Sequence, residues 1–223
     1  MKHLLICSVT LILISCGTSK IPASATSSNE ITSLSYFEPI SYIQYIEKGN
    51  TAMLSDSLSL ISRNKLDSIL SENKEDLRLS EKIILDDQAV KGRIENEVAY
   101  YAALMMQRKK LNKSPLAKTI DSVMESNHQR FALATVVTGF GRRKGNYRGQ
   151  VAKGAAIGIL TLGMAIPTPV KSNVAMYALI FDSEKNQVAY YRMCMPVEKD
   201  PTDEKILGKQ FASLFKDYLS GKK

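Results

Sequence analysis

The chain has 223 residues, with 30 lysines and arginines against 22 aspartates and glutamates, and its formal net charge at pH 7 is +8. Three cysteines and two histidines exclude a disulfide-rich scaffold, and they are too few for a zinc site unless several carboxylates join them. The first segment, Met1-Lys2-His3, is short and basic, and residues 4–14 are apolar apart from a serine and a threonine. A stretch of this length is typical of a signal-peptide core and is too short to cross ~30 Å of hydrocarbon as a helix.

The apolar stretch ends in Leu13-Ile14-Ser15-Cys16-Gly17, which resembles the lipobox of bacterial lipoproteins. The resemblance implies that residues 1–15 are a removable signal peptide and that the Cys16 thiol receives a diacylglyceryl group. Acylated Cys16 would then anchor the mature chain in a lipid bilayer. The alternative is an ordinary signal peptide with a chance cysteine. Because Cys7 leaves with the signal and Cys16 carries lipid, we expect no intramolecular disulfide, and Cys194 is interpreted as a small buried core residue.

A lipid anchor predicts a location in the cell envelope. Gly17 follows the lipidated cysteine, where an acidic residue would resemble a signal for inner-membrane retention, and no acidic cluster resembling a surface-export signal comes after it. We therefore expect the outer membrane, with the protein facing the periplasm. The polyanions of that compartment are phospholipid headgroups, lipopolysaccharide and peptidoglycan carboxylates, so nucleic acid is not an expected partner despite the positive charge. A basic surface without a specific anion is the alternative.

Residues 16–35 are rich in serine, threonine and alanine, and we predict a lipidated, flexible tether there, about 25 Å in root-mean-square length. Residues 36–223 are predicted to form one domain. Its expected strands, from β-branched runs and alternation, are 40–46, 77–85, 131–138, 174–181 and 188–195. Its expected helices, each opened by a capping residue before an apolar stripe, begin at Ser62, Asp87, Ser114 and Asp200.

The order of these elements is β-α-β-α-α-β, a long loop, then β-β-α. It predicts an α/β (α+β) fold: a single domain with a mixed, mostly antiparallel sheet, helices packed on it, and a glycine-rich insertion at 139–170. Over residues 39–219 this order is similar to the small α/β domain of curli-secretion lipoproteins, penicillin-binding-protein-activator lipoproteins and the N-terminal domain of the Tol-system β-propeller protein. The resemblance implies a domain that binds other envelope proteins and catalyses nothing. No shared motif carries binding residues over to this chain.

The first part of the insertion, residues 139–149, crowds four cations among four glycines, and the cations are Arg142, Arg143, Lys144 and Arg148. Exposed backbone amides and guanidinium groups bind phosphate oxygens, so an anionic headgroup or a glycan is a candidate ligand. Two phosphate-binding motifs fail here, because Lys144 replaces the third glycine of Gly-x-Gly-x-x-Gly and Ala155-Ala156 follows the Walker-like glycine pair. A solvated basic loop is the alternative.

The second part, residues 154–170, is seventeen residues long and contains no charge. Three interpretations stay open for it: a segment buried against the sheet, a membrane-contacting or self-associating segment, and strands contributed to an oligomeric pore, as the curli resemblance implies. Gly154-x-x-x-Gly158 favours close helix contact, although such pairs also arise by chance. A single membrane-spanning helix is not expected, because Pro167 and Pro169 interrupt the segment and about twenty apolar residues are needed.

Enzyme chemistry has little support in the sequence. His128 is the histidine that remains in the mature chain, and no Gly-x-Ser-x-Gly motif accompanies it. Asp86-Asp87 is more typical of a helix start than of a metal site. We predict no catalytic residues, no metal and no cofactor. The predicted function is a lipid-anchored, non-catalytic binding or accessory module with another envelope protein as partner. The alternatives are an oligomeric or membrane-inserting lipoprotein that uses residues 139–170, in a pore or as a secretion accessory, and, third, a hydrolase.

Overall fold

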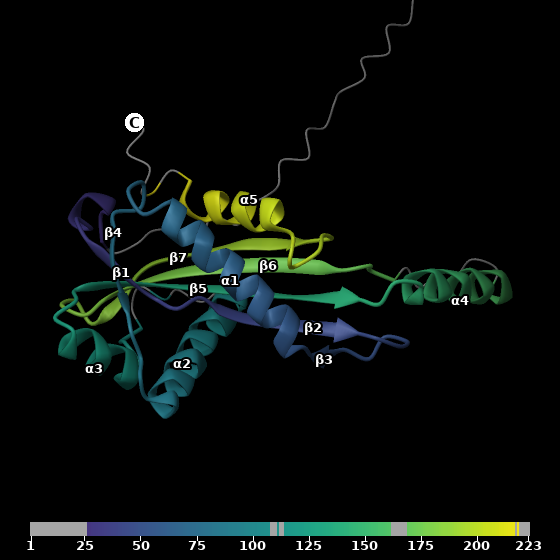
Figure 1. The fold of residues 1–223 in the computed structure, drawn as a ribbon, viewed down its shortest axis with the longest axis horizontal. Helices are drawn as coiled ribbons and strands as arrows, with labels where there is room; N and C mark the ends of the chain where they lie inside the picture. Colours follow the sequence, from purple (N-terminus) through teal and green to yellow (C-terminus); the bar gives the residue numbers. More distant parts are fainter. Residues whose placement is uncertain (1–25, 108–110, 112–113, 162–168, 217, 219–223) are drawn as a thin grey trace, which may run out of the picture.

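Seven strands form one mixed sheet, which carries helices α1 and α5 on one face and α2 and α3 on the other (Figure 1). The computed structural model describes residues 26–107, 111, 114–161, 169–216 and 218. The strands are β1 Leu34–Phe37, β2 Ile40–Ile46, β3 Met53–Leu54, β4 Leu79–Ile83, β5 Phe131–Arg142, β6 Asn173–Asp182 and β7 Gln187–Val197. The helices are α1 Asp56–Glu72, α2 Gln88–Met106, α3 Lys118–Ser126, α4 Asn146–Leu160 and α5 Glu204–Phe215, and a single 3₁₀ turn, Ser28–Glu30, precedes β1. The predicted α/β fold class is confirmed.

Strand β5 is the centre of the sheet. One edge of β5 pairs antiparallel with β6 along almost its whole length, and the other edge is shared by β1 and β2, which both run parallel to it. The ladder breaks between β1 and β2 at Glu38-Pro39, where proline offers no N–H group. Strand β4 adds parallel to β1, β3 antiparallel to β2, and β7 antiparallel to β6. The six pairings thus divide evenly between parallel and antiparallel, and the antiparallel ones include the longest.

Two hydrophobic clusters lie on the two faces of the sheet. Strand β6 contributes to both, because successive side chains of a strand point to opposite faces. Its residues in the α1/α5 cluster are Val174, Met176, Ala178 and Ile180, and those in the α2/α3 cluster are Ala175, Tyr177, Leu179 and Phe181. Strand β6 is therefore covered on both faces, which explains why its sequence is apolar without interruption.

Helix α1 begins at Asp56, six residues before the predicted cap, Ser62. Its N-cap is Ser55, whose hydroxyl accepts from the Leu58 amide. Ser62 lies buried inside the helix and donates its hydroxyl proton to the carbonyl of Pro201, 2.9 Å away. Ser59 also bonds inward, to the backbone of Ile43 in β2. Ser59 and Ser62 face the domain and bond to the backbone of other segments, so Ser62 does not mark a helix end.

The other helix starts are close to the prediction. Asp87 caps α2 as expected. Helix α3 begins at Lys118, four residues after Ser114, and α5 begins at Glu204 with Asp203 as its cap. Asp200 instead accepts a hydrogen bond from the Thr202 amide at 2.8 Å, in a turn before the helix. The last residues of the helix predicted from Asp87 fall partly on 108–110, outside the described residues.

The domain begins earlier than residue 36, so part of the predicted tether belongs to the core. Ile31 and Leu34 are fully buried, and β1 lies between β4 and β5. Thr26 is also held, because its hydroxyl donates to Asp182 at 3.3 Å and its carbonyl accepts from the Tyr218 hydroxyl at 3.1 Å.

The predicted long loop after residue 138 is wrong for its described part. Strand β5 continues to Arg142 and pairs with β6 as far as Phe140 opposite Asn173. Helix α4 then extends away from the end of the sheet (Figure 1). The insertion is therefore the end of a β-hairpin with a helix built into its connection.

Candidate functional site

The base of α4 is fixed to the turn between β2 and β3. After β5 the chain turns at Gly145, whose φ of +90° suits glycine. An Arg142 guanidinium nitrogen donates to the carbonyl of Gly49 at 2.7 Å, and the Asn146 side-chain amide donates to the same carbonyl at 3.1 Å. The Arg143 amide donates to the Ile46 carbonyl at 2.9 Å. These contacts hold the first turn of α4 against the edge of the sheet.

The structure brings the four predicted anion-contact residues together at this base, but their surroundings differ. Arg142 donates a hydrogen bond to the Gly49 carbonyl, and Arg143 forms an exposed ion pair with Glu47 at 3.3 Å. Lys144 and Arg148 are exposed and have no hydrogen bond or ion pair of their side chains within the described part of the chain. Of the four cations, Lys144 and Arg148 are the better placed to meet an external anion. Cys16, the predicted lipidation site, lies outside the described residues.

Most described residues of helix α4 are exposed, although Gly154 is buried. Val151 is 42% exposed, Ile157 40% and Ile159 77%, and none of its described side chains belongs to either hydrophobic cluster. The interpretation that the uncharged segment packs on the sheet is therefore wrong for residues 155–157 and 159. Residues 162–168 lie outside the described chain. Large apolar side chains on a protruding helix mark a contact surface more often than a stable solvated one.

The N-terminus of α4 differs from those of the other described helices. In each of the others a side chain accepts a hydrogen bond from first-turn amides; these caps are Ser55 for α1, Asp87 for α2, Glu97 for α3 and Asp203 for α5. Helix α4 begins at Asn146 after the N-cap residue Gly145, no side chain caps it, and Lys144 and Arg148 lie on either side of its start. Cations at this positive end of a helix dipole cost about 0.3–1 kcal/mol each. Their placement does not serve the stability of the helix.

The sequence around the protrusion contains no negative charge. From residue 126 to residue 181 there is no aspartate or glutamate, while Lys153 and Lys171 add to the four cations. Glu47 and Glu198 approach from neighbouring segments, where Glu47 pairs with Arg143 and Glu198 accepts from the Lys171 amide at 3.0 Å. The base and first half of α4 are therefore strongly positive.

Comparison of the chain with protein-family models, with curated proteins and with solved structures gave no significant match. The likeness to curli-secretion and related lipoproteins thus stays a prediction from the order of elements. None of the described helices combines the length and the apolar composition needed to span a bilayer.

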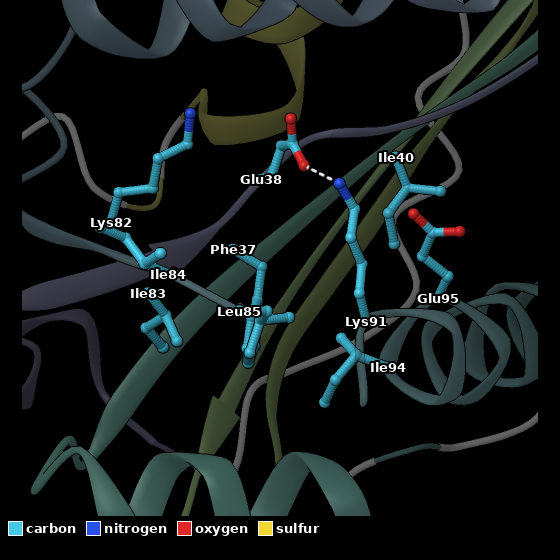
Figure 2. Close-up of a pocket in the computed structure, with 10 residues that line it drawn as sticks. All are labelled: Phe37, Glu38, Ile40, Lys82, Ile83, Ile84, Leu85, Lys91, Ile94 and Glu95. Atoms are coloured by element: carbon cyan, nitrogen blue, oxygen red, sulfur yellow. Dashed lines mark hydrogen bonds and ion pairs between the residues drawn. The ribbon is translucent and has the colours of Figure 1, made fainter. Parts of the chain in front are cut away.

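A cavity of about 230 Å³ lies on the sheet face that carries α2, where the parallel strands β1 and β4 end (Figure 2). The carboxyl ends of parallel strands are a common place for ligands. Its apolar walls include Phe37, Ile83 and Ile94, and the Lys91 ammonium reaches across it to the Glu38 carboxylate. Burial raises the pKa of Glu38, but the hydrogen bond and charge of Lys91 outweigh it and hold that pKa below its ordinary value. Lys91 and Glu38 satisfy each other, while the other two charged lining residues, Lys82 and Glu95, contact Asp67 and the Tyr42 hydroxyl.

The remaining candidates for chemistry are dispersed. His128 is exposed in the turn between α3 and β5, with a φ of +54°. Asp87 caps α2, in agreement with its interpretation as a helix-start acid. Within the described ranges no three His, Cys, Asp or Glu residues group in a way that could hold a metal ion. Cys194 is buried in β7, and its thiol donates to the Gln210 carbonyl at 3.3 Å, which suits the predicted structural thiol.

Proposed function

We propose that this protein is a lipid-anchored, non-catalytic accessory protein of the cell envelope, which contacts a second envelope component through helix α4. The observation that carries the proposal is the exposure of Ile157 and Ile159 on a helix that belongs to neither hydrophobic cluster. The lipobox at Cys16 supports the anchor, and an outer-membrane location facing the periplasm follows from the residues after it. The protein would hold the membrane through acylated Cys16 and reach its second contact through α4.

A membrane-inserting or oligomeric lipoprotein is the second candidate function. The same exposed helix favours it, because residues 139–170 are the segment that such a protein would use. The two candidates differ in what α4 does: in the first it contacts a second envelope component, which is either a protein or the surface of a bilayer, and in the second it assembles with further copies of the chain or forms part of a pore.

Photocrosslinking in intact cells tests the proposal. A photoreactive amino acid in place of Ile159 in the full-length lipoprotein is expected to crosslink efficiently to an envelope component. The matched control is Ile84, because its side chain is 75% exposed against 77% for Ile159 but lies on the body of the domain. Equal, weak crosslinking from both positions would contradict a contact role for α4.

The anchor is tested separately through the cysteine. We expect Cys16→Ser to leave an uncleaved precursor that incorporates no labelled palmitate, because the thiol is the atom that receives the lipid. Cys7→Ser, within the apolar core of the signal, is the control and should be processed and labelled like the natural chain. Normal cleavage and labelling of the Cys16→Ser chain would remove the lipoprotein assignment.

A further inference from the structure

We infer, resting on the proposed function, that α4 is a membrane-docking element: its cationic half binds anionic phospholipid headgroups and its apolar tip enters the acyl chains. The occupant of the exposed helix is thus the bilayer itself. Helix α4 is the one described helix that projects from the end of the sheet, so its far end can enter a bilayer without a clash with the described domain (Figure 1).

The polarity of α4 changes along its axis, from the base to the tip. Arg148 and Lys153 lie in its first two-thirds, and no charge occurs from residue 154 to residue 170. With 1.5 Å of rise per residue, Ile159 lies about 9 Å beyond Lys153. The headgroup layer on each side of a bilayer is about 5–8 Å thick, so with Lys153 among the headgroups Ile159 reaches hydrocarbon. The whole helix is about 22 Å long and would enter one leaflet only.

Charge complementarity favours an anionic surface. Lys144 and Arg148 flank the uncapped N-terminus of α4, and Lys153 follows within two turns. All three are exposed, and their side chains have no ion pair within the described part of the chain. Helix C-termini enter hydrocarbon only when their carbonyls are bonded. At the tip, the Ile157 carbonyl accepts from both the amide and the hydroxyl of Thr161, each at 2.9 Å.

A second copy of the chain fits the same surface less well. Pairing two α4 helices side by side would bring Arg148 and Lys153 of one close to those of the other, and α4 contains no carboxylate to balance them. Like charges on facing helices destabilise association. A layer of phosphate groups removes this repulsion.

The position of the anchor sets the orientation. Thr26 is held at Asp182, the end of β6 farthest from α4, and β5 spans about 37 Å between these two ends. Nine residues separate Cys16 from Thr26, and the ten Cα–Cα steps between them span at most about 35 Å. A domain that stood upright on α4 would therefore strain its own anchor. Docking in the anchoring membrane inclines the long axis of the domain and inserts α4 obliquely.

Vesicle binding tests the inference without the lipid anchor. The chain from Gly17 onward lacks Cys16 and keeps every described element. It is floated with vesicles of phosphatidylglycerol and phosphatidylcholine in equal parts at physiological ionic strength, and with vesicles of phosphatidylcholine alone. In parallel, an Ile159→Cys chain carries an environment-sensitive dye at residue 159, with doxyl groups on the acyl chains as quenchers.

We expect binding to the anionic vesicles, a blue shift of the dye and quenching by the doxyl lipids. Arg148→Ser with Lys153→Ser should weaken binding about thirtyfold, or about fivefold for each cation. Lys74→Ser with Lys118→Ser removes the same charge from exposed sites on the body and should leave binding within about twofold. In the chain labelled at residue 159, Ile157→Asp should abolish the blue shift, whereas Ile84→Asp should not change it.

Three outcomes would overturn the inference. They are no binding to anionic vesicles, equal loss of binding in the α4 double variant and the control double variant on the body, or a dye that stays exposed to water on the vesicle. A stable oligomer in solution that shields residue 159 before lipid is added would favour a second copy instead. The proposed function fails on different evidence, namely a Cys16 that carries no lipid, or crosslinking from Ile159 that is no stronger than crosslinking from Ile84. If Ile159 crosslinks to a protein and the chain does not bind vesicles, the accessory function stands, but the bilayer is excluded as the contact of α4.

Discussion

Gly139→Ala is expected to destabilise the domain by about 2–3 kcal/mol, as measured by denaturant unfolding. A methyl group on Gly139 would lie 2.1 Å from the carbonyl oxygen of Asn173, which is a backbone atom and cannot rotate away. Gly139 pairs with Val174 in β6 and with Ile43 in β2, so the added volume would separate strands on which α4 depends. The Asn173 side chain holds the same place from the other direction, because it accepts from the Phe140 amide at 3.1 Å.

Gly141→Ala is the matched control for this change. It lies two residues further along the same strand, and a methyl group there would meet Leu58 at 3.5 Å and Tyr45 at 3.8 Å, which are ordinary contacts. We expect its stability to stay within about 0.5 kcal/mol of the natural chain, because the alanine also restricts the unfolded state. Equal losses at both positions would mean that glycine is needed for strand flexibility, and that the close approach of Asn173 is not the cause.

Gly139 also shows where sequence reasoning reached its limit. Its spacing with Gly141 suggests part of a phosphate loop, and in the structure both glycines are strand residues beside a returning backbone. A close approach between residues 139 and 173 depends on how the chain returns after α4. No local pattern reports that distance.

The elements that were predicted well depend on local chemistry. Ile40–Ile46 is rich in β-branched and aromatic residues and has the predicted bounds, and Asp87 caps α2 by hydrogen bonds from nearby amides. Strand β1 was missed, because its four residues are buried on all sides and therefore show no alternation, and because they follow a serine-rich segment. Its place between β4 and β5 is a tertiary property.

Helix α4 could not be predicted from periodicity for a physical reason. None of its described side chains joins a hydrophobic cluster, so its apolar residues need not recur every three or four positions, and Gly149 and Gly154 lower its helix propensity. The cations at its base were identified from composition, and the structure adds which of them have intramolecular partners. The cavity beside α2 gave no signal, since its walls come from β1, β2, β4 and α2.

Asp182→Ala is expected to cost about 2–3 kcal/mol of folding free energy, because it removes the buried centre of a charged cluster. The Asp182 side chain is fully buried at the end of β6. Its carboxylate accepts from Arg130 at 3.2 and 3.4 Å, from the Thr26 hydroxyl at 3.3 Å and from the Lys185 amide at 3.2 Å. The hydrogen bond and charge of Asp182 raise the pKa of Arg130, although desolvation opposes this.

The expected loss is smaller than for a fully buried ion pair, because Arg130 is one-third exposed and keeps two other carboxylates, Glu184 at 2.8 Å and Glu30 at 3.5 Å. Glu184→Ala is the matched control, since it removes a partner of the same guanidinium that is 63% exposed. Exposed pairs contribute about 0–1 kcal/mol, so this variant should unfold almost like the natural chain.

Hydrogen exchange separates the role of Asp182 from a general loss of stability. Asp182 holds Thr26, the first described residue, and so fixes where the N-terminal segment leaves the domain at the end opposite α4. In Asp182→Ala the amides from residue 27 to residue 31 should exchange faster than the decrease in global stability explains, while those of α4 should not. Uniform acceleration across both regions, or a Glu184→Ala variant that loses as much stability, would show that Asp182 does not specifically hold the N-terminal end of the described chain.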